Sequence, residues 1–218
     1  PALAVLSVLN APISGALRTT LAADGTLDGL AGTLQIGAGA LSPRAEARPL
    51  SFGGARAYFD FDPATNRIAF SEVAVSAREG SARLSGHADL SEIGPNGFPR
   101  ALLGQFSVDR LRITTPDLFP EPVEVRGGSV DLRLRLDPFT VEVGEWALPS
   151  DTGQPKDALR GTARATAGED GWSADLSLRT QQMQATRLRQ LWPVPVARKA
   201  RAFFLERVEA GTIIDPVV

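Results

Sequence analysis

The chain has 218 residues, of which 43% are hydrophobic and 22% charged, so it can bury a sizeable apolar surface and is not a disordered tail. Its formal net charge is -2, which argues against a nucleic-acid binder that relies on a strongly basic surface. It has no cysteine, which excludes disulfides, thiolate nucleophiles and zinc sites built on sulfur.

The composition is typical of many short strands. The 21 Gly and 16 Pro residues fall between short alternating runs and do not gather in one linker. No apolar run approaches the roughly 20 residues that a membrane-spanning helix needs. The opening sequence PALAVLSVLN has neither an initiating Met nor a basic region. We therefore expect the chain to be part of a longer protein.

The first strand candidates are residues 15–21 and 26–36, joined by an Asp24-Gly25 turn. Residues 56–75 then predict a hairpin with its turn at 62–66, because apolar and polar residues alternate with period two in both arms. A phase shift at Ser71-Glu72 predicts a β-bulge in the second arm. One face of the hairpin would carry Ala57, Phe59, Phe61, Ile68, Phe70, Val73 and Val75.

Residues 127–148 repeat this plan after two strand candidates at 81–90 and 105–113, which a Pro95-Asn96-Gly97 turn separates. Segments 53–75 and 127–148 align through their Gly-Gly starts, their Asp-Pro turns and their second arms, which predicts a duplicated unit. The apolar face of the second hairpin would carry Val130, Leu132, Leu134, Leu136, Val141 and Val143.

The last part of the chain predicts two strands at 159–167 and 171–178, with a turn at 169–171, and then one helix. Pro195 suits the first turn of this helix and Gly211 its stop. Its apolar stripe, which we expect to pack on the sheet, is Val196, Ala200, Phe203, Phe204 and Val208. In the alternative, Arg198, Lys199 and Arg201 touch an anionic membrane surface and Phe203 and Phe204 insert into it.

Residues that could carry chemistry have structural explanations. His87, the one histidine, alternates with apolar residues in the strand candidate 81–90, so we expect it to face solvent or a polar rim. No serine stands in a nucleophile elbow, and Gly37-Ala38-Gly39 lacks the third glycine of a phosphate cradle. The carboxylates beside Gly, Pro or Thr fit turn caps better than an acid/base pair: Asp24, Asp62, Asp137, Asp151 and Asp170. We therefore expect no enzyme, metal site or cofactor.

These patterns predict a mostly β fold. We expect an elongated antiparallel sheet of repeated hairpins, as a β-taco or open sandwich, over residues 1–185, and an amphipathic helix with a return strand over 186–218. Arg133 and Arg135 would lie on its solvated face. The apolar face is either an open groove or the core of a closed sandwich, and it would be lined by Ala57, Phe59, Phe61, Ile68, Phe70, Val130, Leu132, Leu134, Leu136, Val141 and Val143.

The order of these features resembles the AsmA-like superfamily of Gram-negative envelope proteins, especially its YhdP and TamB type members. The repeated hairpins and the Asp-Gly-x-Leu turn at 24–27 are similar over most of the chain but unspecific. The more specific resemblance is Leu191-Trp192-Pro193, followed by Ala197-Arg198 and by FFLERVEAGTI at 203–213.

The resemblance implies a periplasmic β structure, anchored in the inner membrane by an N-terminal helix outside this chain. Its apolar groove would carry phospholipid acyl chains toward the outer membrane, and its partners would be those chains and the flanking parts of the same protein. A scaffold or protein-binding module of the cell envelope is the alternative function. A hydrolase is the least favoured, and we expect no nucleic acid as a partner.

Overall fold

The computed structural model describes residues 8–43, 48–95, 99–150, 154 and 157–215 of this mostly β chain. Eleven strands form one large sheet. They are β2 (Ile13–Leu21), β3 (Leu27–Ile36), β6 (Gly54–Asp62), β7 (Arg67–Ala77), β8 (Gly80–Ile93), β9 (Pro99–Ile113), β10 (Val123–Val125), β11 (Ser129–Leu136), β12 (Phe139–Leu148), β13 (Leu159–Gly168) and β14 (Gly171–Arg179). The shorter elements are β1 (Leu9–Asn10), β4 (Gly39–Leu41), β5 (Leu50–Phe52), β15 (Gln182–Gln184), β16 (Thr212–Ile214), α1 (Ala185–Leu191) and α2 (Arg198–Arg207).

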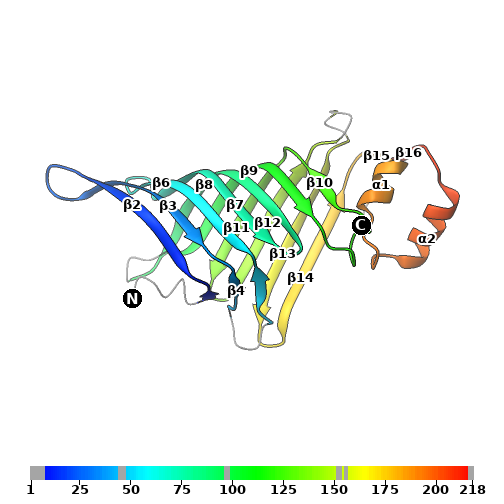
Figure 1. Ribbon diagram of the computed structural model, residues 1–218. Coiled ribbons are helices and arrows are strands. Elements are labelled where there is room, and N and C mark those ends of the chain that lie inside the picture. The colour runs from blue at the N-terminus through cyan, green and yellow to red at the C-terminus, as the bar shows by residue number, and fades with distance from the viewer. Residues whose placement is uncertain (1–7, 44–47, 96–98, 151–153, 155–156, 216–218) are drawn as a thin grey trace.

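The large sheet is antiparallel throughout, in the order β14-β13-β12-β11-β9-β8-β7-β6-β3-β2, and β10 extends the pairing of β9. Figure 1 shows that the sheet curves on itself, so that β2 to β8 lie in front of β11 to β14 and cross them. The predicted class, an antiparallel sheet of repeated hairpins, is therefore confirmed. The sequence left open whether the sheet closes into a sandwich, and the structure shows an open trough.

Bulges in three successive hairpins favour bending of the sheet. The pairing between β6 and β7 skips Ser71, which confirms the bulge predicted there. Asp109 is skipped between β8 and β9, and Gly144 between β11 and β12. Because a bulge adds a residue to one strand and increases the local twist, these three residues favour curvature over a flat sheet. Ser71 and Gly144 occupy equivalent positions in the two aligned hairpins.

A strap between β3 and β6 connects the two walls of the trough. Its strand β4 pairs with β1 and β5, outside the large sheet. Leu41 of β4 packs against Phe139 and Ala167, which lie on the opposite wall. The indole nitrogen of Trp172 on β14 donates a hydrogen bond of 2.7 Å to the backbone oxygen of Arg48. The curvature of the sheet thus brings the early part of the chain against its last hairpin.

The trough is thinly packed. The accessible surface of the whole chain is 13534 Å². A compact monomer of 23.1 kDa exposes about 9,700 Å² by the usual size scaling. Among the described residues nine hydrophobic ones are buried, and none of the large side chains is fully covered. The buried cluster of Phe139 and Ala167 lies under the strap. Most apolar side chains of the sheet are therefore only half-buried.

The helical end of the chain differs from the prediction. It contains two helices, and α1 was not predicted. The expected packing of the C-terminal helix on the sheet is wrong, because Figure 1 places α2 beyond the end of the sheet and no residue of α2 is buried. The ring of Phe204 packs instead on Trp192, with ring centroids 5.6 Å apart. Phe203 on the same helix is 65% exposed.

Candidate functional site

One face of the sheet, here called the groove face, is apolar across all its long strands. Strand pairing aligns its side chains in rows that run from β2 to β14. The central row is Leu17, Gly32, Phe59, Phe70, Gly86, Phe106, Val130, Trp146, Gly161 and Leu178. The row beside it is Thr19, Leu30, Phe61, Ile68, Ala88, Gly104, Leu132, Val143, Ala163 and Leu176.

The structure brings the lining residues inferred from the sequence onto this one face. Those on β6 and β7 lie on the front wall, and those on β11 and β12 on the opposite wall. Period-two alternation accounts for both sets. A bulge follows each set, at Ser71 in β7 and at Gly144 in β12, and Val73 and Trp146 lie on the same face beyond it. The predicted lining does not include Phe106, Trp146 or Leu178. Phe106 and Leu178 follow the alternation of their own strands, and Trp146 returns to this face after the bulge at Gly144.

The central row combines aromatic side chains with glycines on neighbouring strands. The rings of Phe59 and Phe70 have centroids 6.5 Å apart, and those of Phe70 and Phe106 are 5.8 Å apart. A methyl group at Gly32 would lie 3.1 Å from the Phe59 ring, and one at Gly161 would lie 2.6 Å from Cζ2 of Trp146. The glycines therefore leave room for rings to lie across the neighbouring strand, which keeps the floor of the trough shallow and smooth.

Away from the part under the strap, the groove face is exposed at both edges of the sheet. Leu17 on β2 is 67% exposed and Leu176 on β14 is 61% exposed, although both belong to the apolar rows. Further in, Phe59, Phe70 and Phe106 are half-buried. Monomeric soluble proteins rarely expose an apolar surface this long and this open, so the surface indicates a site that binds an apolar partner.

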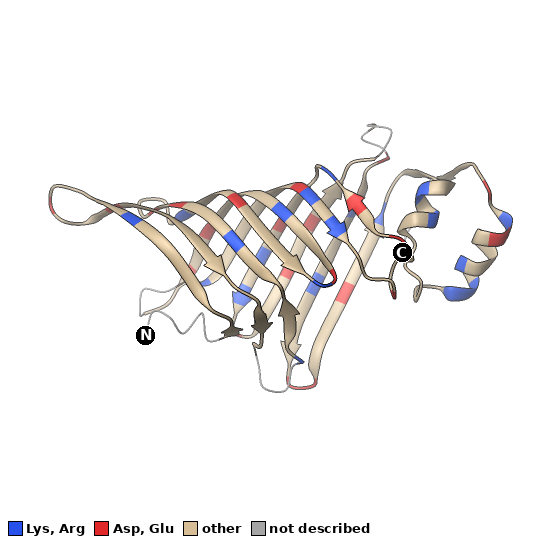
Figure 2. Cartoon of the chain, in the orientation of Figure 1, with Lys and Arg blue, Asp and Glu red and all other residues tan. Residues whose placement is uncertain are grey.

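The other face of the sheet, here called the outer face, carries charged side chains of both signs that form ion pairs with one another. Figure 2 shows Lys and Arg interspersed with Asp and Glu along the strands. Arg133 lies opposite Glu142 and Leu103, as expected for a solvated face. Ion pairs connect Arg67 with Asp89 at 2.6 Å, Arg83 with Glu72 at 3.4 Å, Arg160 with Glu145 at 2.7 Å and Arg164 with Glu142 at 3.4 Å. The outer face thus presents charged side chains to water, and the apolar side chains lie mainly on the groove face.

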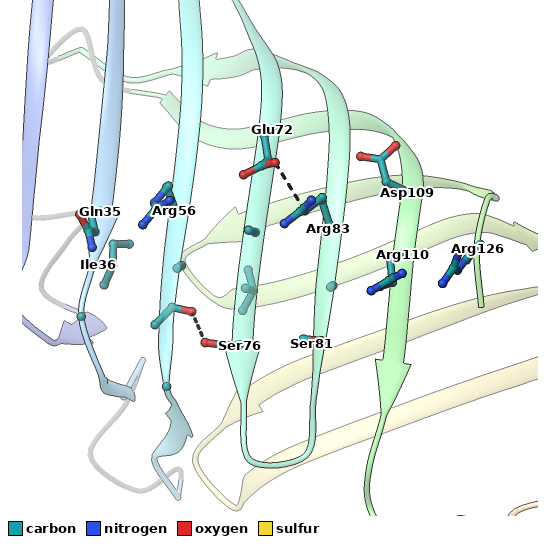
Figure 3. A pocket seen from close by; sticks show the side chains of 17 residues that line it. Gln35, Ile36, Arg56, Glu72, Ser76, Ser81, Arg83, Asp109, Arg110 and Arg126 are labelled. Carbon is teal, nitrogen blue, oxygen red and sulfur yellow. Dashed lines mark hydrogen bonds and ion pairs between the residues drawn. The ribbon is translucent and has the colours of Figure 1, made fainter. Parts of the chain in front are cut away.

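A hollow of about 780 Å³ crosses β3 to β9, and charged side chains of the outer face line it. Figure 3 shows four arginines from separate elements around it: Arg56, Arg83, Arg110 and Arg126. Glu72 pairs with Arg83, and Glu124 pairs with both Arg110 and Arg126 at 3.4 Å. Because carboxylates neutralise most of its cations, the hollow does not present a strong anion site.

The residues singled out for chemistry lie apart from one another. His87 lies on the outer face between Ala69 and Gln105. Asp24 accepts hydrogen bonds from the backbone and hydroxyl of Thr26, and Asp62 from Ala64 and Thr65. Side-chain hydrogen bonds from these threonines lower the pKa of both carboxyls.

The remaining sites named from the sequence also fall in turns or outside the described chain. Asp137 precedes Pro138 in the β11–β12 turn, and Asp170 lies in the β13–β14 turn. Asp151, Asn96 and Gly97 lie outside the described residues. Within the described part of the chain, no three Asp, Glu or His side chains gather in a way that could hold a metal ion.

The described helices are too short and too polar for any of them to cross a membrane. No family model, curated protein or solved structure matches this chain.

Proposed function

We propose that this chain is a segment of a bridge-like lipid-transfer protein and that its groove face shields phospholipid acyl chains from water. The observation that carries the proposal is the apolar face itself, which continues across all the long strands and stays open to solvent. The resemblance to AsmA-like envelope proteins supports the same function, with the periplasm as the location and an inner-membrane anchor in the full-length protein.

The physical basis is burial of apolar area without chemistry. Each acyl methylene that leaves water for an apolar surface gains about 0.8 kcal/mol. A long, smooth trough contacts an acyl chain along its length without one specific contact. The acyl chain can therefore also slide along the trough. The rings of Phe59, Phe70 and Phe106 offer flat apolar contact, and the outer face keeps the segment in water.

Photocrosslinking from matched pairs of neighbours tests the proposal. Phe59 points into the groove, whereas Tyr58 belongs to the outer face opposite Glu72. Leu134 and Arg133 form a second such pair on β11. A photoreactive residue at Phe59 or Leu134 in cells should yield phospholipid adducts, and one at Tyr58 or Arg133 should not. The absence of adducts at the groove positions, or equal adducts at all four, would exclude a lipid groove.

The alternative function is a scaffold or protein-binding module of the cell envelope. The edge strands favour it, since β2 and β14 each pair on one side only among the described strands. A partner strand could extend the sheet at either edge and cover Leu17 or Leu176. A lipid-free chain that gives adducts to protein alone from Leu17 would favour this alternative.

A further inference from the structure

We propose that α2 docks this end of the protein onto an anionic phospholipid surface. The proposal is independent of the lipid groove, because α2 lies beyond the sheet and contributes no groove-face side chain. It rests on three observations: the fixed orientation of the helix, the side chains on its free face, and its charge.

Two arginines and one ring contact fix the orientation of α2. Arg189 of α1 donates hydrogen bonds to the backbone oxygens of Leu205 and Val208, at the C-terminal end of α2. A cation there also suits the helix dipole. Arg201 donates a hydrogen bond of 3.2 Å to the backbone oxygen of Trp192. Together with the packing of Phe204 on the Trp192 ring, these contacts hold one side of α2 against α1 and leave the other side free.

The free side carries one large apolar side chain between cations. Phe203 is 65% exposed. Lys199 and Arg207 stand one helical turn before and after it, so the three side chains share a face, and both cations are exposed. This arrangement is typical of a helix that lies in a membrane interface, with the ring among the acyl chains and the cationic heads at phosphate level.

The positive charge of α2 favours an anionic surface as the partner of its free face. The helix has four cationic side chains and one carboxylate, in a chain whose net charge is -2. Figure 2 shows several Lys and Arg positions, coloured blue, along α2. Glu206 pairs with Arg207 at 3.5 Å, but both are mostly exposed, so the pair is weak. A protein groove that binds a helix needs several apolar anchors at helical spacing, and this face offers only Phe203 among the described residues.

Sedimentation with vesicles tests the docking. The full chain should bind vesicles of phosphatidylcholine and phosphatidylglycerol in equal parts, and should bind pure phosphatidylcholine vesicles far more weakly. Phe203→Ser should lower the partition coefficient roughly tenfold. The double variant Lys199→Gln with Arg207→Gln should lower it by at least about tenfold and flatten its salt dependence.

The matched control is Leu103→Ser, which removes an exposed apolar side chain from the outer face of β9, away from both α2 and the groove face. It should leave vesicle binding unchanged, and unfolding curves should confirm that each variant folds. Equal binding of the parent chain to neutral vesicles, or unchanged binding of the Phe203 and cation variants, would overturn the proposal. A dimer that Phe203→Ser dissociates, without vesicle binding, would assign the face to a second copy. Crosslinking from Phe59 would be unaffected by any of these outcomes.

Discussion

Gly161 provides the sharpest test of how the floor of the trough is built. It lies directly opposite Trp146 on the neighbouring strand. A methyl group at Gly161 would lie 2.6 Å from Cζ2 and 2.8 Å from Cε2 of the indole, and closer still to the backbone oxygen of Ser177. Gly161→Ala therefore forces the indole to move or the strands to part. We expect a loss of about 2 kcal/mol in the free energy of unfolding, as for other overpacked sites.

Urea and thermal unfolding measure this loss, and Gly144→Ala is the matched control. Gly144 lies in the bulge of β12, and a methyl group there meets no other atom within 4 Å. For a chain of this size, about 2 kcal/mol corresponds to a fall in Tm of roughly 4–8 °C. The control should unfold close to the parent. If both variants were equally stable, the packing of Trp146 across Gly161 would be refuted, and with it the shallow floor.

Two further predictions concern the strap and the outer face. Trp172→Phe keeps a ring beside Phe139 but removes the hydrogen bond to Arg48. It should lower the free energy of unfolding by about 1 kcal/mol and speed amide hydrogen exchange in β4. Unchanged exchange would mean that this hydrogen bond does not hold the strap. The pKa of Asp89 lies below its usual value of 3.8, chiefly because Arg67 donates hydrogen bonds to it. The contribution of Asp89 to stability should therefore be complete above about pH 4 and be lost as the pH falls through the lowered pKa. The difference in Tm between the parent chain and Asp89→Asn should accordingly disappear in acid. A gap that persists at low pH would show that the charge of Asp89 is not the cause.

Local alternation predicted the long strands because it depends only on neighbours in the sequence. The hairpin of β6 and β7, its bulge at Ser71 and the face shared by Phe59 and Phe70 all follow from period two. The strap could not be predicted in this way, since β4 and β5 are too short to show a period. The contact between Leu41 and Phe139 also depends on the curvature of the whole sheet.

The helical end was harder to predict for a similar reason. α1 has seven residues, which is about two turns and too few for a clear apolar stripe. The stripe expected on the second helix is divided in the structure, since Phe204 turns toward Trp192 and Phe203 toward solvent. Apolar spacing locates a helix, but it does not show whether the sheet, another helix or a membrane covers it.

The same limit applies to the groove and explains why its openness had to come from the structure. A closed sandwich and an open trough require the same alternation, so the difference lies in how strongly the sheet bends. Here a bend is built into both aligned hairpins, because Ser71 and Gly144 place a bulge at the same point of the two units. Each bulge turns its strand while the next residues, Val73 and Trp146, return to the apolar face. Curvature and lining are thus specified together within these two hairpins, as the proposed shielding of acyl chains by an open trough requires.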